Sequence, residues 1–316
     1  MRLTRFLIIA SIFCVDLPPT TAVAIGQPKP RSSTIIFDLG GVLLGVDNKA
    51  CARELGITNF ISYKLRGGSP STIKTAFFDA LNRLPSPIAT NGARTPDGRP
   101  MPGIMCAWLM GAVPSRDLCQ HVCKEIADHP EWFSSAVEQL LVGKTARMTF
   151  DPVRFARTMK PVGGAVEFVR ACKARGYRVA VLSNWDPESF RLIARKYHNL
   201  FCLFDDITVS GDVGCMKPSP EIFELATQHV PAASCIFIDD QKENLAAARA
   251  RGMKTIWCKP RSALIGSKPN LPGVHKKLVR MEQEQQTTEQ LPAPVYRLVQ
   301  EPGTHEAQDA TTGSHA

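Results

Sequence analysis

An α/β fold with a doubly wound, Rossmann-like parallel sheet core and an inserted α-helical domain is expected from this sequence. Residues 34–38, 178–183 and 234–240 form short, mostly apolar runs, and each run ends in an acid or a serine. Short unbroken apolar runs are typical of parallel strands that are covered on both faces. Helical patterns separate the later runs, and this alternation indicates a doubly wound sheet.

The segments between these strands carry the marks of helices. Residues 164–175 and 242–251 have apolar side chains at helical spacing, and a glycine follows each segment. Asp186-Pro187 and Ser219-Pro220 each place a capping side chain before a proline, which suits the first turn of a helix. Two weaker strand candidates complete the pattern: residues 207–209 and 255–258.

The alternation stops between Gly45 and Val162, where the pattern becomes helical. Candidate helices lie near residues 49–55, 72–83, 115–128 and 131–142. We therefore predict a helical cap insertion over residues 46–159, flanked by two core segments at residues 31–45 and 160–260.

The N-terminal segment resembles an export signal. Arg2 and Arg5 precede an apolar run, and small residues spaced as A-x-A follow at Ala22–Ala24. We expect a secretory signal peptide and linker over residues 1–30, with a periplasmic or secreted product; a cytoplasmic location is the alternative. Because the apolar run is shorter than the roughly 20 residues that a bilayer requires, no stable membrane span is predicted.

Composition indicates a globular protein of ordinary type. The 316 residues are 44% hydrophobic and 21% charged, with a net charge of +9. The basic balance favours anionic partners, but no dense Lys/Arg run or RNA-binding signature appears, so no nucleic-acid partner is expected. Residues 261–316 are rich in Glu, Gln and Thr near their middle, which predicts a mostly disordered tail with a short helix.

Cysteine spacing does not suggest a metal site. The chain has 10 cysteines, and loss of Cys14 with a signal peptide would leave nine, which cannot all pair. Cys119 and Cys123 have the spacing of a ligand pair, but no second pair completes a site. We expect these two side chains to pack in a core.

The polar residues that end the apolar runs are the candidate site. In an open parallel sheet, ligands bind at the carboxyl ends of the strands, near the point where the strand order reverses. Asp38, Ser183 and the pair Asp239-Asp240 should therefore meet at one edge. Each alone would be an ordinary turn former or cap, but their occurrence together predicts a functional site.

Four segments of the chain resemble the motifs of the haloacid dehalogenase superfamily, with the match covering residues 33–46 and 160–260. The segments are Phe37–Leu43, Leu182–Asn184, Lys217-Pro218 with Pro220, Glu221 and Phe223, and Ile238–Asp240 with Asn244. The resemblance implies a hydrolase, most simply a phosphatase, with a helical cap inserted after the first motif.

The same resemblance implies a nucleophile and a metal. Asp38 would attack a phosphate, and Mg²⁺ would offset the repulsion between two anions. The ligands would be Asp38, the backbone carbonyl of Gly40 and Asp240, with Asp239 a ligand directly or through water. Oxygen ligands of this kind suit a hard cation.

The phosphate contacts implied by the resemblance come from three further residues. The Ser183 hydroxyl and the Asn184 region would hold phosphate oxygens. Lys217 would supply positive charge to Asp38 and to the transition state. The expected partner is therefore a small phosphorylated metabolite, although the cap carries no short motif that identifies it, and no oligomeric state follows from the sequence.

Gly40 departs from the pattern of phosphatases in this superfamily, which usually carry an acid two residues after the nucleophile. Loss of a general acid can lower the rate by roughly 10²–10⁴-fold for a poor leaving group. The glycine therefore suits good leaving groups, a proton donor from the cap, or weak activity. A similar glycine occurs in a sugar-phosphatase-like subset of the superfamily.

Three functions follow from these residues. The first is a Mg²⁺-dependent phosphatase acting through an aspartyl-phosphate on Asp38. The second is a non-enzymatic or weakly active binding protein, which Gly40 would explain. The third is a metal-free haloacid dehalogenase, for which the adjacent acids Asp239 and Asp240 would be an unhelpful concentration of charge.

Overall fold

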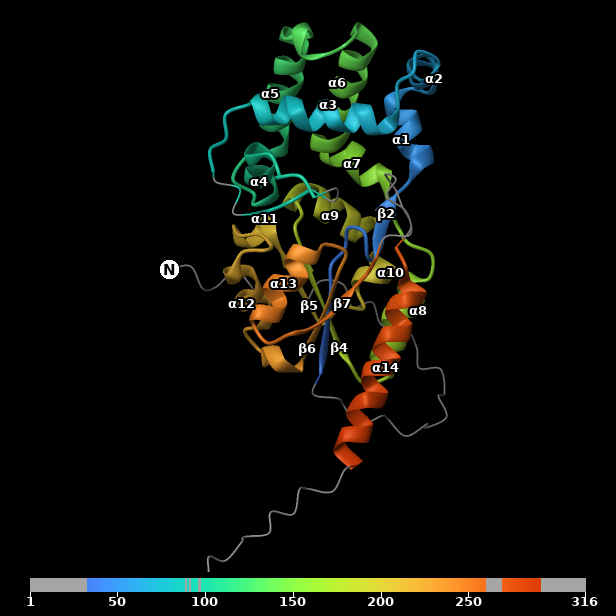
Figure 1. The fold of residues 1–316 in the computed structure, drawn as a ribbon, viewed down its shortest axis with the longest axis vertical. Coiled ribbons are helices and arrows are strands. Elements are labelled where there is room, and N and C mark those ends of the chain that lie inside the picture. The colour runs from blue at the N-terminus through green and yellow to red at the C-terminus, as the bar shows by residue number, and fades with distance from the viewer. Residues whose placement is uncertain (1–32, 89, 91, 96–97, 260–268, 291–316) are drawn as a thin grey trace, which may run out of the picture. The chain divides into compact units, whose positions relative to one another are not determined.

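A computed structural model of the protein describes most of the chain (Figure 1). The described residues are 33–88, 90, 92–95, 98–259 and 269–290. Of these, the residues up to His275 form one unit, and Lys276–Gln290 belong to a second. The signal peptide predicted for residues 1–30 lies outside the described residues and stays a prediction.

Five parallel strands form the central sheet in the order β5-β4-β1-β6-β7. They are β1 (Thr34–Phe37), β4 (Arg178–Ser183), β5 (Asp206–Val209), β6 (Cys235–Asp239) and β7 (Lys254–Trp257). The central strand β1 is buried throughout. β4 and β5 lie on one side of β1, and β6 and β7 lie on the other. The direction in which strands are added therefore reverses beside β1. The predicted parallel sheet is confirmed.

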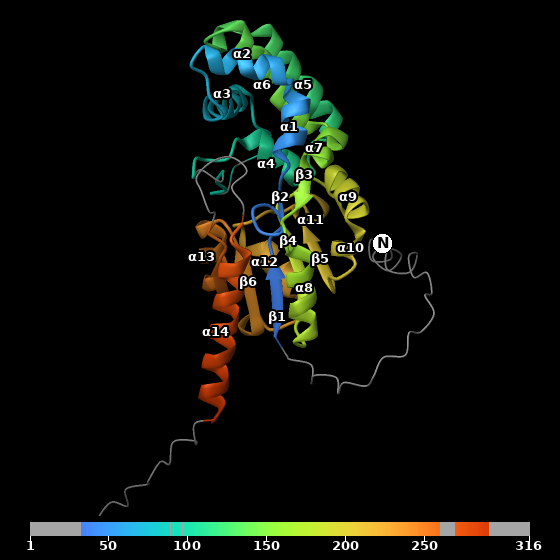
Figure 2. The same ribbon diagram turned by 90° about the vertical axis from the view of Figure 1, so that its right-hand side faces the viewer.

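Helices cover both faces of this sheet, with α8 on one side and α13 on the other (Figure 2). Phe37 contacts Phe168 of α8, whereas Phe237 contacts Phe223 of α12, each pair in an edge-to-face arrangement. The core helices are α8 (Ala165–Ala174), α9 (Pro187–Lys196), α10 (His198–Phe201), α11 (Ser210–Val213), α12 (Pro220–Thr227) and α13 (Lys242–Ala250), with a 3₁₀ turn at Ala232–Ser234. The doubly wound arrangement is confirmed.

The insertion after β1 is helical and is framed by two short strands. β2 (Leu44–Val46) and β3 (Met159–Pro161) pair in antiparallel fashion and connect the insertion to the core. The cap helices are α1 (Asn48–Leu55), α2 (Ile57–Leu65), α3 (Pro70–Arg83), α4 (Gly103–Leu109), α5 (Ser115–Asp128), α6 (Ala136–Phe150) and α7 (Pro152–Thr158). These helices lie beyond the carboxyl ends of the strands (Figure 1).

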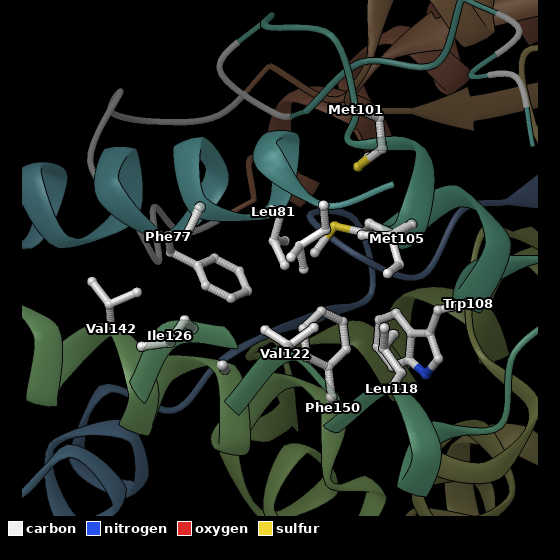
Figure 3. Close-up of a cluster of buried hydrophobic side chains, with 14 of the residues drawn as sticks. Phe77, Leu81, Met101, Met105, Trp108, Leu118, Val122, Ile126, Val142 and Phe150 are labelled. Atoms are coloured by element: carbon white, nitrogen blue, oxygen red, sulfur yellow. The ribbon is translucent and has the colours of Figure 1, made fainter. Parts of the chain in front are cut away.

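The cap has a hydrophobic core of its own (Figure 3). Phe77 and Leu81 of α3 point toward Val122 of α5 and Phe150 of α6. Trp108 of α4 packs edge-to-face on Phe150, with ring centroids 5.1 Å apart. Burial of these large side chains stabilises the fold of the cap.

One predicted cap helix is misplaced. The sequence suggests a helix at residues 131–142, but Pro130–Trp132 forms a 3₁₀ turn and α6 begins at Ala136. Ser135 caps α6, because its hydroxyl accepts a hydrogen bond from the Glu138 N–H at 3.2 Å. The capping residue, rather than the apolar periodicity, sets where the helix starts.

The C-terminal helix is also longer than the short helix predicted for the tail. α14 (Leu271–Gln290) has 20 residues, and the side chain of Asn270 accepts a hydrogen bond from the Gly273 N–H at 3.2 Å. Leu271 and Val274 are buried. No helix among the described residues combines the length and the apolar character that a membrane span requires.

The cap contacts the core through hydrogen bonds between side chains and backbone and through a close approach of two glycines. The Ser210 hydroxyl donates to the Leu109 carbonyl at 2.6 Å, and Glu188 of α9 accepts from the Ser115 N–H at 3.1 Å. Gly111 has φ +70°, and a Cβ there would lie 2.4 Å from the carbonyl oxygen of Gly211. A side chain at Gly111 would therefore separate the cap from the core.

We predict that Gly111→Ala lowers the free energy of unfolding more than Gly214→Ala does. Both glycines have positive φ, which costs an alanine about 1–2 kcal/mol, but a Cβ at Gly214 meets nothing within 4 Å. The clash at Gly111 should add about 1–3 kcal/mol. Urea denaturation of the two variants measures the difference, and equal losses would show that the cap–core contact is loose.

Candidate active site

Asp38 is the first residue after the central strand, and the structure fixes its backbone and carboxylate. Its N–H donates to the Ile238 carbonyl at 2.9 Å, so the β1–β6 ladder continues to the site. Its Oδ1 accepts from the Ser183 hydroxyl at 2.9 Å and from the Lys217 ammonium at 2.8 Å. Asp38 is 7% exposed. The predicted nucleophile therefore contacts the predicted phosphate-binding residues.

Lys217 joins three strands through one buried ammonium group. Its Nζ donates to Asp38, to Asp239 Oδ2 at 2.7 Å and to the Leu182 carbonyl at 2.9 Å. An ammonium has three donors, so this set satisfies all of them. The acceptors follow or belong to β1, β6 and β4. Lys217 therefore links the carboxyl ends of these three strands by hydrogen bonds.

Asn184 holds the Lys217 segment in place. Its Nδ2 donates to the Lys217 carbonyl at 2.9 Å, and its Oδ1 accepts from the Lys217 N–H at 2.8 Å. The sequence assigned the Asn184 region to phosphate binding, but the side-chain amide is engaged by backbone. The Asn184 side chain is therefore a positioning group for Lys217, and its second amide N–H remains a donor for an anion.

Asp239 is fully buried and serves as an acceptor for several donors. Oδ1 accepts from the Gln241 N–H at 2.7 Å and from Asn244 at 3.2 Å, while Oδ2 accepts from Lys217 and from Asn244 at 3.1 Å. A carboxylate has about four lone-pair sites, and these four contacts use them. Either of the two roles that the sequence left open, a direct metal bond or a contact through water, would have to share or displace one of these donors.

Asp240 lies against a glycine that the sequence did not single out as necessary. Gly41 has φ +75°, and a Cβ there would lie 2.4 Å from Asp240 Oδ2. Two features therefore require a glycine at position 41: the left-handed backbone conformation and the close approach of the Asp240 carboxylate. The neighbouring Gly40 lies in the same loop, where its carbonyl remains a candidate metal ligand.

The three acids form a cluster with an excess of negative charge. Ligand oxygens of Asp38, Asp239 and Asp240 lie within 4.8 Å of one another. Burial raises the pKa of Asp38 to about 6 although Lys217 opposes the shift, and burial with the charges of Asp38 and Asp239 raises the pKa of Asp240 to about 8. Both shifts reflect the cost of gathering ionised carboxylates in a buried site, and a bound divalent cation would offset that cost.

Trp185 borders the site and was missed by sequence reasoning. A Cβ built on Gly40 would lie 3.6 Å from Cζ3 of its indole ring. Trp185 is 5% exposed, and its ring is 5.6 Å from that of Phe155 in the cap helix α7. The sequence offered one clue, because Trp185 follows Ser183 and Asn184 directly at the end of a strand.

One cysteine borders this cluster: the Cys258 N–H donates to the Asp239 carbonyl at 2.9 Å, and its thiol lies 3.8 Å from the Gly41 carbonyl oxygen. Cys119 and Cys123 are half-buried and pack against the hydrophobic core of the cap, as the sequence predicted. None of the nine cysteines in the described part of the chain is disulfide-bonded. Within those same residues, the acids at the sheet edge are the group of ligand-type side chains that could hold a metal ion.

Comparison with known proteins agrees with this geometry. A family model described as haloacid dehalogenase-like hydrolase matches residues 33–252. The chain belongs to this family. The haloacid dehalogenase-like match covers the core strands β1, β4, β5 and β6, the cap and all four sequence motifs, so the protein is a hydrolase by family.

Several relatives of this haloacid dehalogenase-like chain are named as phosphatases. A sesquiterpene phosphatase of Aspergillus oryzae is 33% identical over 97 residues, which are 30% of this chain and 49% of the relative. A phosphatase of Mycobacterium tuberculosis is 30% identical over 132 residues, or 39% of this chain and 58% of the relative. The chain thus spans about half the length of these two relatives.

Solved structures of the family are similar at low sequence identity. A haloacid-dehalogenase-like hydrolase from Porphyromonas gingivalis has a TM-score of 0.46 at 18% identity, covering 78% of this chain and 98% of that one. An enzyme of the same family from Bacteroides thetaiotaomicron, in complex with magnesium and inorganic phosphate, has a TM-score of 0.45 at 15% identity, covering 73% and 96%.

We predict that Lys217→Met destabilises the protein far more than Lys173→Met. Lys217 is buried between two acids, so its loss leaves uncompensated charge and should lower the free energy of unfolding by about 3–5 kcal/mol. Lys173 also contacts one acid and one carbonyl, but at the surface, where the expected loss is below about 1 kcal/mol. Similar small losses in urea denaturation would contradict the central role of Lys217.

Asp240→Asn is expected to stabilise the metal-free protein increasingly as the pH rises. The folded-state pKa of Asp240 is raised from 3.8 to about 8, so the folded protein holds its proton longer than the unfolded chain. The Asp240 contribution to stability is therefore present at low pH and lost as the pH rises toward 8. Melting temperatures of wild type and variant in EDTA, compared from pH 4 to pH 8.5, test this. A difference that shrinks with pH would contradict the assignment.

Proposed function

We propose that the protein is a Mg²⁺-dependent phosphatase that hydrolyses small phosphate esters through an aspartyl-phosphate on Asp38. The observation that carries the proposal is the charge arrangement around Asp38. Its carboxylate is held by Ser183 and Lys217 and lies in a cluster of three acids. Such a cluster suits a divalent cation and an anionic substrate together.

The donor set fits Mg²⁺. Asp38, Asp240 and the Gly40 carbonyl would hold the ion with water, and Asp239 would act through water while it positions Lys217. Oxygen ligands and retained waters are what this hard cation prefers. When bound, Mg²⁺ would reduce the repulsion between the attacking carboxylate and the phosphate.

The residues of the chain supply the two displacement steps. Ser183 and Lys217 both donate to Oδ1 of Asp38, and the proposal assigns the attack on phosphorus to Oδ2. The bond between phosphorus and the ester oxygen breaks, and the electron pair leaves with the alcohol oxygen. Water then attacks the phosphorus of the aspartyl-phosphate, the bond between phosphorus and Asp38 Oδ2 breaks with its electron pair returning to the carboxylate, and the water proton leaves with the phosphate or passes to solvent.

Lys217 and Ser183 have a second task in this scheme. After the attack, negative charge on the phosphoryl oxygens lies beside the donors that first held Asp38. A preorganised ammonium in a buried site stabilises such charge without reorganisation. Asn184 and Asp239 fix the backbone and the ammonium of Lys217, so the donor is in place before the substrate arrives.

Two observations favour a phosphatase over the other functions that the motifs allow. A metal-free dehalogenase has no evident use for three gathered acids, whose charge would go unbalanced. In addition, relatives at 30–33% identity are named phosphatases. A weakly active or non-enzymatic binding protein is the alternative that an activity test separates from this proposal.

Asp38→Asn is expected to abolish phosphate-ester hydrolysis, and EDTA should abolish it in the wild type. Loss of a nucleophile lowers turnover by on the order of 10⁴-fold or more. Asp47→Asn is the matched control, because Asp47 caps α1 at the surface and asparagine also caps. Phosphate release from a panel of esters, with and without Mg²⁺, measures the effect.

An acid-quenched reaction supplies the direct test of the intermediate. Mass spectrometry should locate a phosphoryl group on Asp38 in the wild type and none in Asp38→Asn. Turnover that survives in Asp38→Asn or in EDTA would refute the mechanism. Absence of turnover across the panel with saturating Mg²⁺ would favour the binding protein instead.

A further inference from the structure

The space beside Gly40 is bounded by an aromatic ring rather than by a proton donor. Gly40 stands two residues after the nucleophile, and its missing side chain would point at the Cζ3 edge of Trp185. An alanine would fit at 3.6 Å, but a longer side chain would have to pass the ring. The chain thus has an indole edge where a catalytic acid would otherwise reach.

The orientation of Trp185 is fixed by hydrogen bonds on its opposite side. Its Nε1–H donates to the Ser189 hydroxyl at 2.9 Å, and Ser189 in turn donates to the buried carboxylate of Asp186. Its backbone N–H donates to the Ser210 hydroxyl at 2.9 Å. Since the polar atom of the indole faces Ser189, the edge directed at Gly40 is apolar.

The cap extends this apolar surface. Phe155 of α7 contacts Trp185 across the boundary between cap and core, with ring centroids 5.6 Å apart. In an in-line displacement, the leaving group departs on the side opposite the attacking oxygen. In the proposed mechanism Asp38 would attack from the sheet edge, and a leaving group that departs toward the cap would meet Trp185, whose ring contacts Phe155.

We infer that Trp185 is a specificity-determining residue and that the site selects phosphate esters of aromatic hydroxyl compounds, that is, aryl phosphates. This inference rests on the proposed phosphatase function. A phenolic oxygen leaves as a stable anion, so it needs no proton from a side chain at Gly40. The ring attached to that oxygen can pack on the indole and on Phe155, where an aliphatic polyol would lose hydration.

The reaction balances without a general acid. The P–O bond breaks, the aryl oxide leaves with the electron pair, and it takes its proton from water after release. The site therefore selects a leaving group for two properties, its acidity and its aromatic ring. Its acidity compensates for Gly40, and its planar apolar ring matches Trp185.

Two comparison substrates separate acidity from ring contact. Hexafluoroisopropyl phosphate has a leaving group about as acidic as phenol but no ring, and benzyl phosphate has a ring on a weakly acidic alcohol. The wild type with Mg²⁺ should prefer phenyl phosphate over both in kcat/KM. Against benzyl phosphate the preference should be about 10²-fold or more, because no acid assists departure.

Variants at Trp185 test the ring contact. Trp185→Leu should lower the ratio of kcat/KM for phenyl over hexafluoroisopropyl phosphate by about 3- to 10-fold, the range of an aromatic contact. Trp185→Phe keeps a ring and should retain most of the preference. A loss of stability alone would lower turnover of both esters equally, so the ratio reports specificity.

The outcomes are distinguishable. Equal turnover of phenyl and hexafluoroisopropyl phosphate by the wild type would overturn the role of Trp185 and leave the phosphatase proposal intact, whether or not Trp185→Leu folds. An unchanged ratio in a folded Trp185→Leu would overturn it as well. Absence of turnover of all three esters, with turnover of another ester in the panel, would overturn the aryl-phosphate inference alone, whereas absence across the whole panel would refute the phosphatase function as well.

Discussion

The buried ammonium of Lys217 is the interaction on which the rest of the site depends. It is 2% exposed and donates to two acids and a carbonyl that follow or belong to three neighbouring strands. Burial alone would lower the pKa of Lys217, but Asp239 and Asp38 reverse the shift and keep it charged. A charge in such surroundings is tolerated only when its partners hold it closely, so the geometry of Asp38 and that of Lys217 are not independent.

The surrounding elements can be understood as supports for that ammonium. The parallel sheet carries Asp38 and Asp239 to one edge, but Lys217 comes from a segment outside the strands and needs a separate anchor. The Asn184 side chain supplies it with two hydrogen bonds to the Lys217 backbone. Asn244 and the Gln241 N–H similarly complete the shell of Asp239. Catalytic contacts and structural contacts are therefore shared by the same few side chains.

The sequence predicts the parts of this arrangement that local chemistry determines. Apolar runs place Asp38 and Asp239 at strand ends, and the motif resemblance adds Lys217. The role of the Asn184 amide was missed because its partner lies 33 residues away. Trp185 was missed for the same reason, since only the fold brings its ring beside Gly40. The error at α6 is local, because capping by Ser135 decides where that helix begins.

The charge of the leaving group connects two features of the site: the absence of an acidic side chain at Gly40 and the aromatic side chains of Trp185 and Phe155. On the proposed mechanism, a leaving group that departs without a proton carries its negative charge toward the cap, past Trp185 and Phe155. Charge concentrated on one oxygen is costly against such apolar side chains, because they cannot replace the lost water. Delocalisation into a ring lowers that cost. The excess negative charge of the acids adds to it unless a cation is bound, so metal loading and leaving-group choice should be coupled.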